Sequence, residues 1–287
     1  MAYENFIPSV WNEGIQRNLE RQCVFVEDCN RKYEGNVKQK GDSVRILGVG
    51  RPTIKSIARE NTSKDIDGPE EVEDTSVVLP IDQIRYFNYM VGDIDKAQAV
   101  GGVMDALQEE TAEGLADEVD KYIANHATDT SIKKLYSTVP KVVVGTASTG
   151  EKDVLDILDE AARVLYENDV KTTTKIVATV SPRFYMAFRK AYTAKDTDNS
   201  KELKNGKVSI YGNIIIKMSN NVCKTDSGAT DNIMMRTQRA IAYANPLTHT
   251  EPYRPEKKFA DAVKGYILFG SKIVRPKEIV NINVKYA

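Results

Sequence analysis

The 287-residue sequence has few of the residues from which metal and redox sites are built. Its two histidines, His126 and His249, lie far apart, and neither has a second histidine at the short spacing that zinc sites use. The three cysteines, Cys23, Cys29 and Cys223, form an odd set without metal-type spacing, which argues against a disulfide framework. We therefore predict no metal, no cofactor, and thiols that are buried or chemically neutral.

The sequence also lacks a long hydrophobic run and an excess charge of either sign. No stretch of about 18 apolar residues occurs, so no membrane-spanning segment is expected. The first residues, MAYENFIPSVWNEG, lack the basic stretch and apolar core of a signal peptide, and synthesis and assembly in the cytosol are therefore expected. Lys and Arg total 40 and Asp and Glu total 41, whereas a dedicated nucleic-acid-binding protein is usually strongly basic.

Motifs for nucleotide binding and nucleophilic catalysis are missing as well. Gly48 and Gly50 follow a predicted strand, but the third glycine of a dinucleotide fingerprint is absent and Pro52 does not open a helix. No phosphate-loop motif and no GxSxG nucleophile turn occur. Asp93 and Asp95 could serve acid–base or metal chemistry, but capping of a predicted helix explains them better. No catalytic residue is predicted, and the chain is not expected to be an enzyme.

Apolar residues recur with helical spacing in some segments and alternate in others, which predicts a mixed α and β fold. The predicted helices are 9–26, 93–126, 153–167 and 182–192. The predicted strands are 43–47, 75–91, 139–145, 175–180, 213–218, 233–236, 240–243, 259–269, 272–274 and 279–286. Because helices and strands alternate between residues 145 and 243, this region is expected to form a compact α/β unit.

The most unusual region runs from Gly48 to Val91. Residues 48–74 show no regular apolar period, and residues 65–74 hold six acids and no base. A structureless loop of this length is uncommon in a compact domain unless it has a function. The strand predicted over 75–91 carries apolar residues on both faces and would be about 55 Å long if continuous. Such a hairpin arm exposes apolar surface that a copy of the same protein is expected to cover.

Four stretches carry a recognisable family pattern: FIPSVWNEGIQRNLERQCVF at 6–25, YEGNVKQKGDSVRI at 33–46, YFNYMVGDIDKAQA at 86–99 and ADEVDKYIA at 116–124. Together they resemble the major capsid (coat) proteins of tailed bacteriophages with the HK97-like fold, and the resemblance covers essentially the whole chain. It implies an α+β fold with an N-terminal arm, an extended β-hairpin loop, a long spine helix, a peripheral domain and an axial α/β domain.

The resemblance also implies how these parts divide the sequence. The N-terminal arm maps to 1–40 and the extended loop (E-loop) to 41–92. The peripheral domain, which contains the spine helix, maps to 93–148 and 245–287. The axial domain maps to 149–244. The extended loop of the family coincides with the arm inferred above from strand length.

A structural role follows from the same resemblance. The chain would self-assemble into hexamers and pentamers that form the icosahedral head around phage double-stranded DNA, contacted without sequence preference. Its location would be the virion capsid, assembled in the host bacterial cytoplasm without a membrane partner. Some members of the family carry an N-terminal scaffolding segment that is cleaved during maturation. Because this chain begins almost at once with the arm, a separate scaffolding protein is expected, together with a portal protein; a mature, already cleaved form is the alternative. A net charge near zero favours the packing of many copies.

Two alternatives stay open at this point. An encapsulin-type bacterial compartment shell protein has the same fold but holds an enzyme cargo instead of DNA and a portal. An α/β enzyme without a recognisable motif would instead be a small soluble oligomer with measurable turnover. Mass spectrometry of purified particles separates the first alternative, and size-exclusion chromatography with negative-stain microscopy separates the second.

Acidic and aromatic residues of the arm and loop are the predicted subunit-interface residues. They are Asp65, Glu70, Glu71, Glu73, Asp74, Phe87, Tyr89 and Trp11. The acidic run 65–74 is expected to meet the C-terminal region of another copy, because residues 252–287 carry eight bases and three acids.

Reversal of Asp65, Glu70 and Glu73 to lysine should therefore impair shell assembly without unfolding the subunit, because it turns the proposed attraction into repulsion. Negative-stain microscopy measures assembly, and a thermal melt of the subunit serves as the control. Normal shells from the triple variant would contradict the proposed contact.

Overall fold

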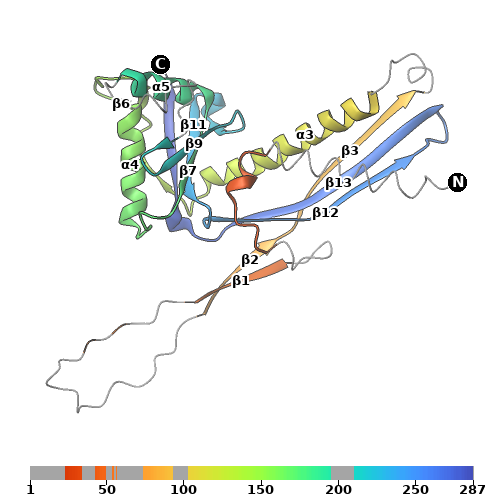
Figure 1. Ribbon diagram of the computed structural model, residues 1–287, viewed down its shortest axis with the longest axis horizontal. Helices are drawn as coiled ribbons and strands as arrows, with labels where there is room; N and C mark the ends of the chain where they lie inside the picture. Colours follow the sequence, from red (N-terminus) through yellow and green to blue (C-terminus); the bar gives the residue numbers. More distant parts are fainter. Residues whose placement is uncertain are drawn as a thin grey trace, which may run out of the picture.

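The computed structural model describes residues 23–33, 43–49, 74–92, 103–194 and 210–286, together with Ile54 and Ser56. Figure 1 shows three parts: a compact α/β body, an elongated sheet with a long helix, and a hairpin that projects from their junction. Short 3-10 turns are η1 (Val26–Asp28), η4 (His126–Thr128), η5 (Asp226–Gly228) and η6 (Pro276–Glu278). Within the described residues, no helix is long and apolar enough to cross a membrane.

The body is built on a nine-stranded sheet of order β6-β5-β14-β11-β7-β9-β8, in which β10 pairs with β11 and β4 with β14. Its strands are β4 (Lys133–Lys134), β5 (Lys141–Val143), β6 (Glu151–Asp153), β7 (Ile176–Val180), β8 (Ile210–Tyr211), β9 (Ile214–Met218), β10 (Cys223–Thr225), β11 (Thr230–Thr237) and β14 (Ile279–Tyr286). Every residue of β7 and β11 is buried, as is typical of strands that are covered on both faces.

Two amphipathic helices, α4 (Val154–Glu167) and α5 (Pro182–Ala194), pack on this sheet. Eight residues of α4 are buried, and they recur at the spacing that places them on one side of a helix. The start of α5 is set by Ser181, whose Oγ accepts a hydrogen bond from the Phe184 N–H at 3.4 Å, and by Pro182 in the first turn.

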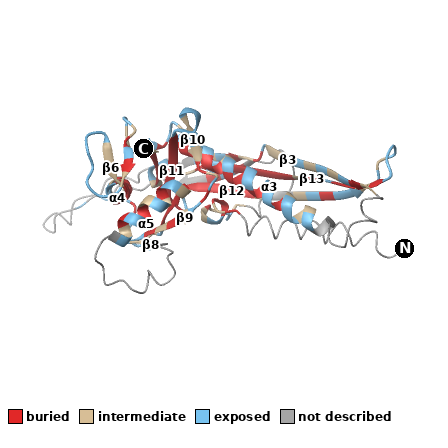
Figure 2. Ribbon diagram, turned by 90° about the horizontal axis from the view of Figure 1, so that it is seen from above, coloured by how far each residue is buried: buried red, intermediate tan, exposed pale blue. Residues whose placement is uncertain are grey.

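The elongated part consists of a three-stranded antiparallel sheet and one helix. The sheet has the order β12-β13-β3, with β12 (Ile241–Tyr253), β13 (Ala260–Ile273) and β3 (Gln83–Gly92). Helix α3 (Val103–Asn125) runs along one face, where the Tyr122 ring meets the Phe269 ring edge-on at 5.4 Å between centroids. On the same face the Arg85 Nε lies 3.7 Å from a Glu118 carboxylate oxygen. Figure 2 shows buried residues along this helix and sheet, continuing into the body.

The hairpin consists of β1 (Ser43–Val49) and β2 (Asp74–Pro80), which pair antiparallel from Ser43 opposite Pro80 to Val49 opposite Asp74. A small separate core holds its root against β12 and β13. That core consists of Val44, Ile46, Leu79, Ile81, Ala242, Ala244 and Leu268. The root lies so close to β13 that a Cβ on Gly270 would stand 2.1 Å from the Pro80 carbonyl oxygen.

The predicted α+β class is confirmed, and the helices over 153–167 and 182–192 correspond to α4 and α5. The single long strand predicted over 75–91 is wrong. The chain leaves the hairpin after Pro80, passes through Ile81 and Asp82, and enters a different sheet as β3. Proline cannot donate to a strand ladder, so the ladder ends there.

Other strand predictions need smaller corrections. The predicted strands 259–269 and 272–274 form one strand, β13, and the expected loop over 219–232 contains β10. Most of the helix predicted over 9–26 and the first residues of the helix over 93–126 lie outside the described residues.

Sheet membership also differs from the predicted division into domains. The strand β3 pairs with β13, so residues 83–92 lie in the sheet of the predicted peripheral domain rather than in the extended loop. The strands β4, β5 and β14 lie in the sheet of the predicted axial domain. Their place there follows from register, because Ile282 of β14 pairs with Ile233 of β11 at the centre of that sheet. The division into four parts itself stays a prediction.

Replacing Gly270 with alanine should lower the free energy of unfolding by about 1–3 kcal/mol, because the new methyl group forces the Pro80 carbonyl away from β13. Urea denaturation of the subunit measures the loss. Gly114→Ala is the control, because nothing lies within 4 Å of a Cβ there and alanine favours the helix. A Gly270→Ala variant as stable as the original chain would contradict this packing.

Candidate subunit-interface surfaces

The hairpin is the first surface that the protomer leaves without cover. At its root Val44, Ile46 and Leu79 are buried, but Val78 of the same hairpin is 45% exposed. A two-stranded sheet without a third strand or a helix on it is marginally stable in water. Of the hairpin residues whose side chains the structure describes, the buried ones lie at the root, and Val78 is left for a further surface to cover.

The second surface is the face of the three-stranded sheet that points away from α3, called the open face below. On β3 it carries Tyr86, which is 81% exposed, and Met90, which is 51% exposed. In register, Tyr86 lies opposite Tyr266 of β13, which lies opposite His249 of β12. The His249 and Tyr266 rings lie 5.6 Å apart between centroids. A row of three rings therefore crosses this face beyond the hairpin root, and none of the three is buried by the described residues.

A polar row runs beside these rings on the open face. The Lys264 Nζ lies 3.3 Å from a Glu251 carboxylate oxygen and 5.2 Å from the centroid of the Tyr253 ring. The Tyr253 hydroxyl donates a hydrogen bond to the Asn88 Oδ1 at 3.1 Å. Aromatic residues and methionine among paired polar groups are typical of protein interfaces.

The strand β3 adds an uncovered edge to this surface. It pairs with β13 on one side, and no strand of the described part of the chain pairs on the other. Its sequence, QIRYFNYMVG, contains one charge, Arg85, and neither lysine nor proline. Natural edge strands are usually protected by such residues, by bulges or by a covering segment. This ten-residue edge, which no strand of the described residues pairs with, is therefore a candidate surface for contact with another chain.

The structure places the predicted interface residues in three different situations. Phe87 and Tyr89 lie on the face of β3 opposite to Tyr86, half-buried and stacked on each other at 5.9 Å. Asp74 begins β2 opposite Val49. Trp11, Asp65, Glu70, Glu71 and Glu73 lie outside the described residues. Contact of these residues with another subunit stays a prediction.

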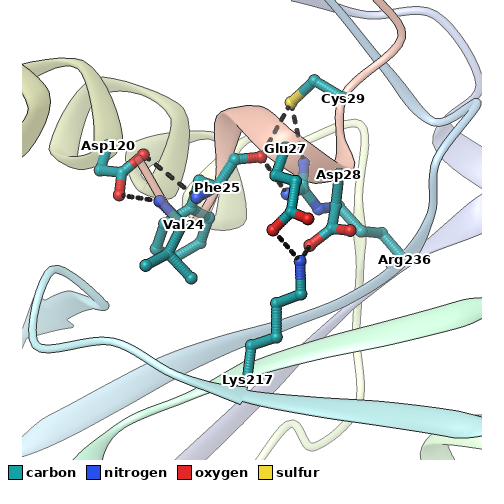
Figure 3. Close-up of polar contacts among 8 residues, drawn as sticks. All are labelled: Val24, Phe25, Glu27, Asp28, Cys29, Asp120, Lys217 and Arg236. Atoms are coloured by element: carbon teal, nitrogen blue, oxygen red, sulfur yellow. Dashed lines mark hydrogen bonds and ion pairs between the residues drawn. The ribbon is translucent and has the colours of Figure 1, made fainter. Parts of the chain in front are cut away.

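A third feature is the segment 23–30, which is anchored where the body meets the elongated part (Figure 3). The Asp120 carboxylate on α3 accepts hydrogen bonds from the Val24 N–H at 2.8 Å and the Phe25 N–H at 3.1 Å. From β11, the Arg236 guanidinium donates to the Phe25 carbonyl at 2.8 Å and to the Cys29 Sγ at 3.2 Å. The carboxylate on α3 thus binds backbone N–H groups of segment 23–30, and the guanidinium on β11 binds a carbonyl and a thiol of the same segment.

Further contacts tie the end of this segment to β9 and β12. The Lys217 Nζ lies 2.6 Å from a Glu27 carboxylate oxygen and 2.7 Å from one of Asp28. The Asn30 N–H donates to the Ile241 carbonyl at 2.8 Å. Segment 23–30 is therefore bound by four different elements of the chain.

The two anchoring charges are withdrawn from solvent. Asp120 is 2% exposed and Arg236 is fully buried. Burial raises the pKa of the Asp120 carboxyl to about 6, against the opposing effect of the backbone N–H donors and of Arg236. Burial likewise raises the pKa of the Cys29 thiol, although Arg236 lowers it.

Neither anchoring charge is predicted as a site residue from the sequence. Asp120 lies in the helix predicted over 93–126 and directly follows the apolar Val119. Arg236 is the only charge in the apolar run from Ile233 to Arg236. A charge that interrupts an apolar stripe or strand was the available signal. Among the residues that the structure describes, no three His, Cys, Asp or Glu side chains gather in a way that could hold a metal ion.

Comparison of the sequence with family models and with curated proteins gives no match. Comparison of the fold with solved structures does. The chain is similar to a solved structure described as Mycobacterium phage Che8, with 26% sequence identity, a TM-score of 0.69 and 91% of each chain covered. It is also similar to the capsid structure of the cyanophage P-SCSP1u, with 16% identity, a TM-score of 0.69, and 92% of this chain and 88% of that chain covered.

A third similar structure is a virus-like particle from Pyrococcus furiosus. Here the identity is 12% and the TM-score 0.59, with 98% of this chain and all of that chain covered. At such identities the likeness shows a common fold. The likeness extends over nearly the whole chain, so these structures resemble both the elongated part and the body of this protein.

The two faces of β3 should respond differently to truncation in the unassembled subunit. Phe87→Ala should lower the free energy of unfolding by about 2–4 kcal/mol, because the ring packs against the main core. Tyr86→Ala should change it by less than about 0.5 kcal/mol, because that ring is exposed. Urea denaturation measures both variants, and equal losses would contradict the assignment of the faces.

Proposed function

We propose that this chain, which has the HK97-like fold of tailed-phage capsid proteins, is the major capsid protein of a tailed bacteriophage and forms the wall of its head. The role is structural rather than catalytic. Copies associate as hexamers and pentamers and close into an icosahedral shell around double-stranded DNA.

The observation that carries this proposal is the apolar and backbone surface that the protomer leaves uncovered in its elongated part. The open face exposes Tyr86 and Met90, and the turn between β12 and β13 exposes 87% of Phe259. The edge of β3 and the hairpin add unpaired strand surface. A monomeric protein with these features would be prone to aggregate, whereas a shell covers them with neighbouring copies.

Assembly from such surfaces depends on many modest contacts. Each copy both covers a neighbour and is covered by one, so the contacts add up around a closed shell. The net charge of −1 opposes this packing little. The acidic run 65–74 of one copy and the basic region 252–287 of another supply a polar contact that sets their orientation.

Further partners follow from the same role. Packaged DNA contacts the inner wall without sequence preference. A separate scaffolding protein directs assembly, and a portal protein occupies one vertex. The protein is a virion component that assembles in the host cytoplasm. The body corresponds to the axial domain, and the elongated sheet with α3 corresponds to the peripheral domain with its spine helix.

A compartment shell is the second candidate function, favoured by the similarity to the virus-like particle from Pyrococcus furiosus. Both candidates predict a closed shell of this chain, and they differ in its contents. Mass spectrometry and nucleic-acid quantification of purified particles separate them. Packaged DNA and a portal support the phage head, and an enzyme cargo without DNA supports the compartment.

Replacing Tyr86 and Met90 together with serine should reduce shell yield at least tenfold while the subunit stays folded, because both side chains are exposed in the protomer and contact a neighbouring copy in the proposed shell. Sedimentation and negative-stain microscopy measure the yield. Tyr86→Phe is the matched control, since it keeps the ring and should assemble normally. Normal shells from the double serine variant would contradict a role of the open face in assembly.

A further inference from the structure

One end of the body sheet brings together four segments that are far apart in the sequence. At this end β14 begins opposite Arg236 of β11, and Thr237, the last residue of β11, lies opposite Ile176, the first residue of β7. On the other side of β14, Lys133 of β4 lies opposite Val280. The segments that enter or leave the strands here are 129–133, 168–175, 237–240 and 274–278.

Hydrogen bonds fix these segments to one another. The Asn168 Nδ2 donates to the Lys277 carbonyl at 3.0 Å, which joins the second segment to the fourth. The Arg275 N–H donates to the Ala240 carbonyl at 3.2 Å, which joins the fourth segment to the third. Side chains from distant parts of the sequence are therefore held close together at this end, which is called the basic end below.

The basic end carries an excess of positive charge in a chain whose formal net charge is −1. Its four segments hold three acids, which are Asp129, Asp169 and Glu278. They hold six bases, all of them exposed: Lys133, Lys171, Lys175, Arg239, Arg275 and Lys277. Arg275 pairs with Glu278 at 2.8 Å, and none of the other five bases forms an ion pair with a residue that the structure describes.

Four of these bases form a row across neighbouring strands. In the order β4, β14, β11 and β7, each strand has one base at its end or within two residues of it: Lys133, Lys277, Arg239 and Lys175. Neighbouring strands lie about 4.8 Å apart, so the row is about 15 Å long. Double-stranded DNA carries about one negative charge per 1.7 Å of its axis, so a row of this length meets several phosphates at once.

The surface around these bases is polar. Thr172, Thr173 and Gln238 are exposed there, and no large exposed apolar side chain lies in the four segments. The open face differs, because it exposes Tyr86 and Met90. Contacts between proteins favour aromatic residues and methionine, whereas nucleic-acid interfaces are polar and positively charged. The composition of the basic end therefore favours a nucleic acid over another protein as its ligand.

We propose that the basic end binds phosphate groups of the packaged double-stranded DNA. The four segments contain no aromatic residue on which unpaired bases could stack, which favours a duplex over a single strand. Their bases contact the DNA backbone, so binding has no sequence preference. This inference rests on the proposed function, and it adds that this end of the body points to the inside of the shell.

Replacing Arg239 and Lys277 with glutamine should lower the affinity of the full-length subunit for DNA at least about fivefold, because two phosphates lose their contacts. The probe is a fluorescein-labelled duplex of about 30 base pairs and mixed sequence. Fluorescence anisotropy measures its binding between about 50 and about 200 mM salt. The slope of log affinity against log salt concentration should become shallower by about 2, since each phosphate contact contributes about 0.9.

Two further variants serve as matched controls. Lys257→Gln with Lys258→Gln removes the same charge from the turn between β12 and β13 and should bind the duplex like the original chain. Arg239→Lys with Lys277→Arg keeps the charge and should also bind normally. Unchanged binding of the glutamine variant of Arg239 and Lys277 would overturn the site. An equal loss in the variant of Lys257 and Lys258 would overturn it as well, because only total charge would then matter.

The acidic run 65–74 of another copy is the competing ligand for these bases. A synthetic peptide of that sequence should displace the labelled duplex less readily than unlabelled duplex does. Displacement by the peptide at a lower concentration than by unlabelled duplex would overturn DNA as the ligand.

Shell formation separates this inference from the proposed function. The glutamine variant of Arg239 and Lys277 should form shells at the original yield, because the site contacts DNA rather than a neighbouring copy. Loss of shells from this variant would overturn the assignment to DNA. Particles of the original chain that contain no DNA would instead contradict the proposed function, whatever the subunit binds in solution.

Discussion

A three-stranded sheet with a helix on only one face cannot cover its own apolar surface, and the rest of the structure depends on this constraint. Helix α3 lies on the side of Phe87 and Phe269, so Tyr86 and Met90 face outward. The three-stranded sheet extends away from the body (Figure 1). The edge of β3 and the open face are therefore not covered by the body. In the proposed shell, neighbouring copies cover this edge and this face.

The junction of the two parts is built on a different principle. The hairpin root and α3 are fixed there by apolar packing, as at Gly270 against Pro80, whereas segment 23–30 is fixed through buried charges. The same junction therefore combines apolar packing with charged groups that bind backbone donors and acceptors.

Local patterns in the sequence predicted the elements of the body well, because α4 and α5 each carry a clear apolar stripe or cap. The break after Pro80 was missed because alternation of apolar residues continues across it, and only pairing partners reveal two sheets. The pairing of β14 with β11 joins distant parts of the chain, which no local pattern encodes. The orientation of Phe87 toward α3 likewise depends on the sheet being half covered. Asp120 and Arg236 act through contacts with backbone groups, which leave no motif.

The central claim is that neighbouring copies cover the open face. Hydroxyl-radical footprinting of purified particles and of dissociated subunits tests it directly, because it reports the solvent access of Tyr86, Met90 and Phe259 in each state. We predict that all three are oxidised several-fold more slowly in particles. Equal oxidation in the two states, or a chain that stays monomeric at high concentration, would contradict the account.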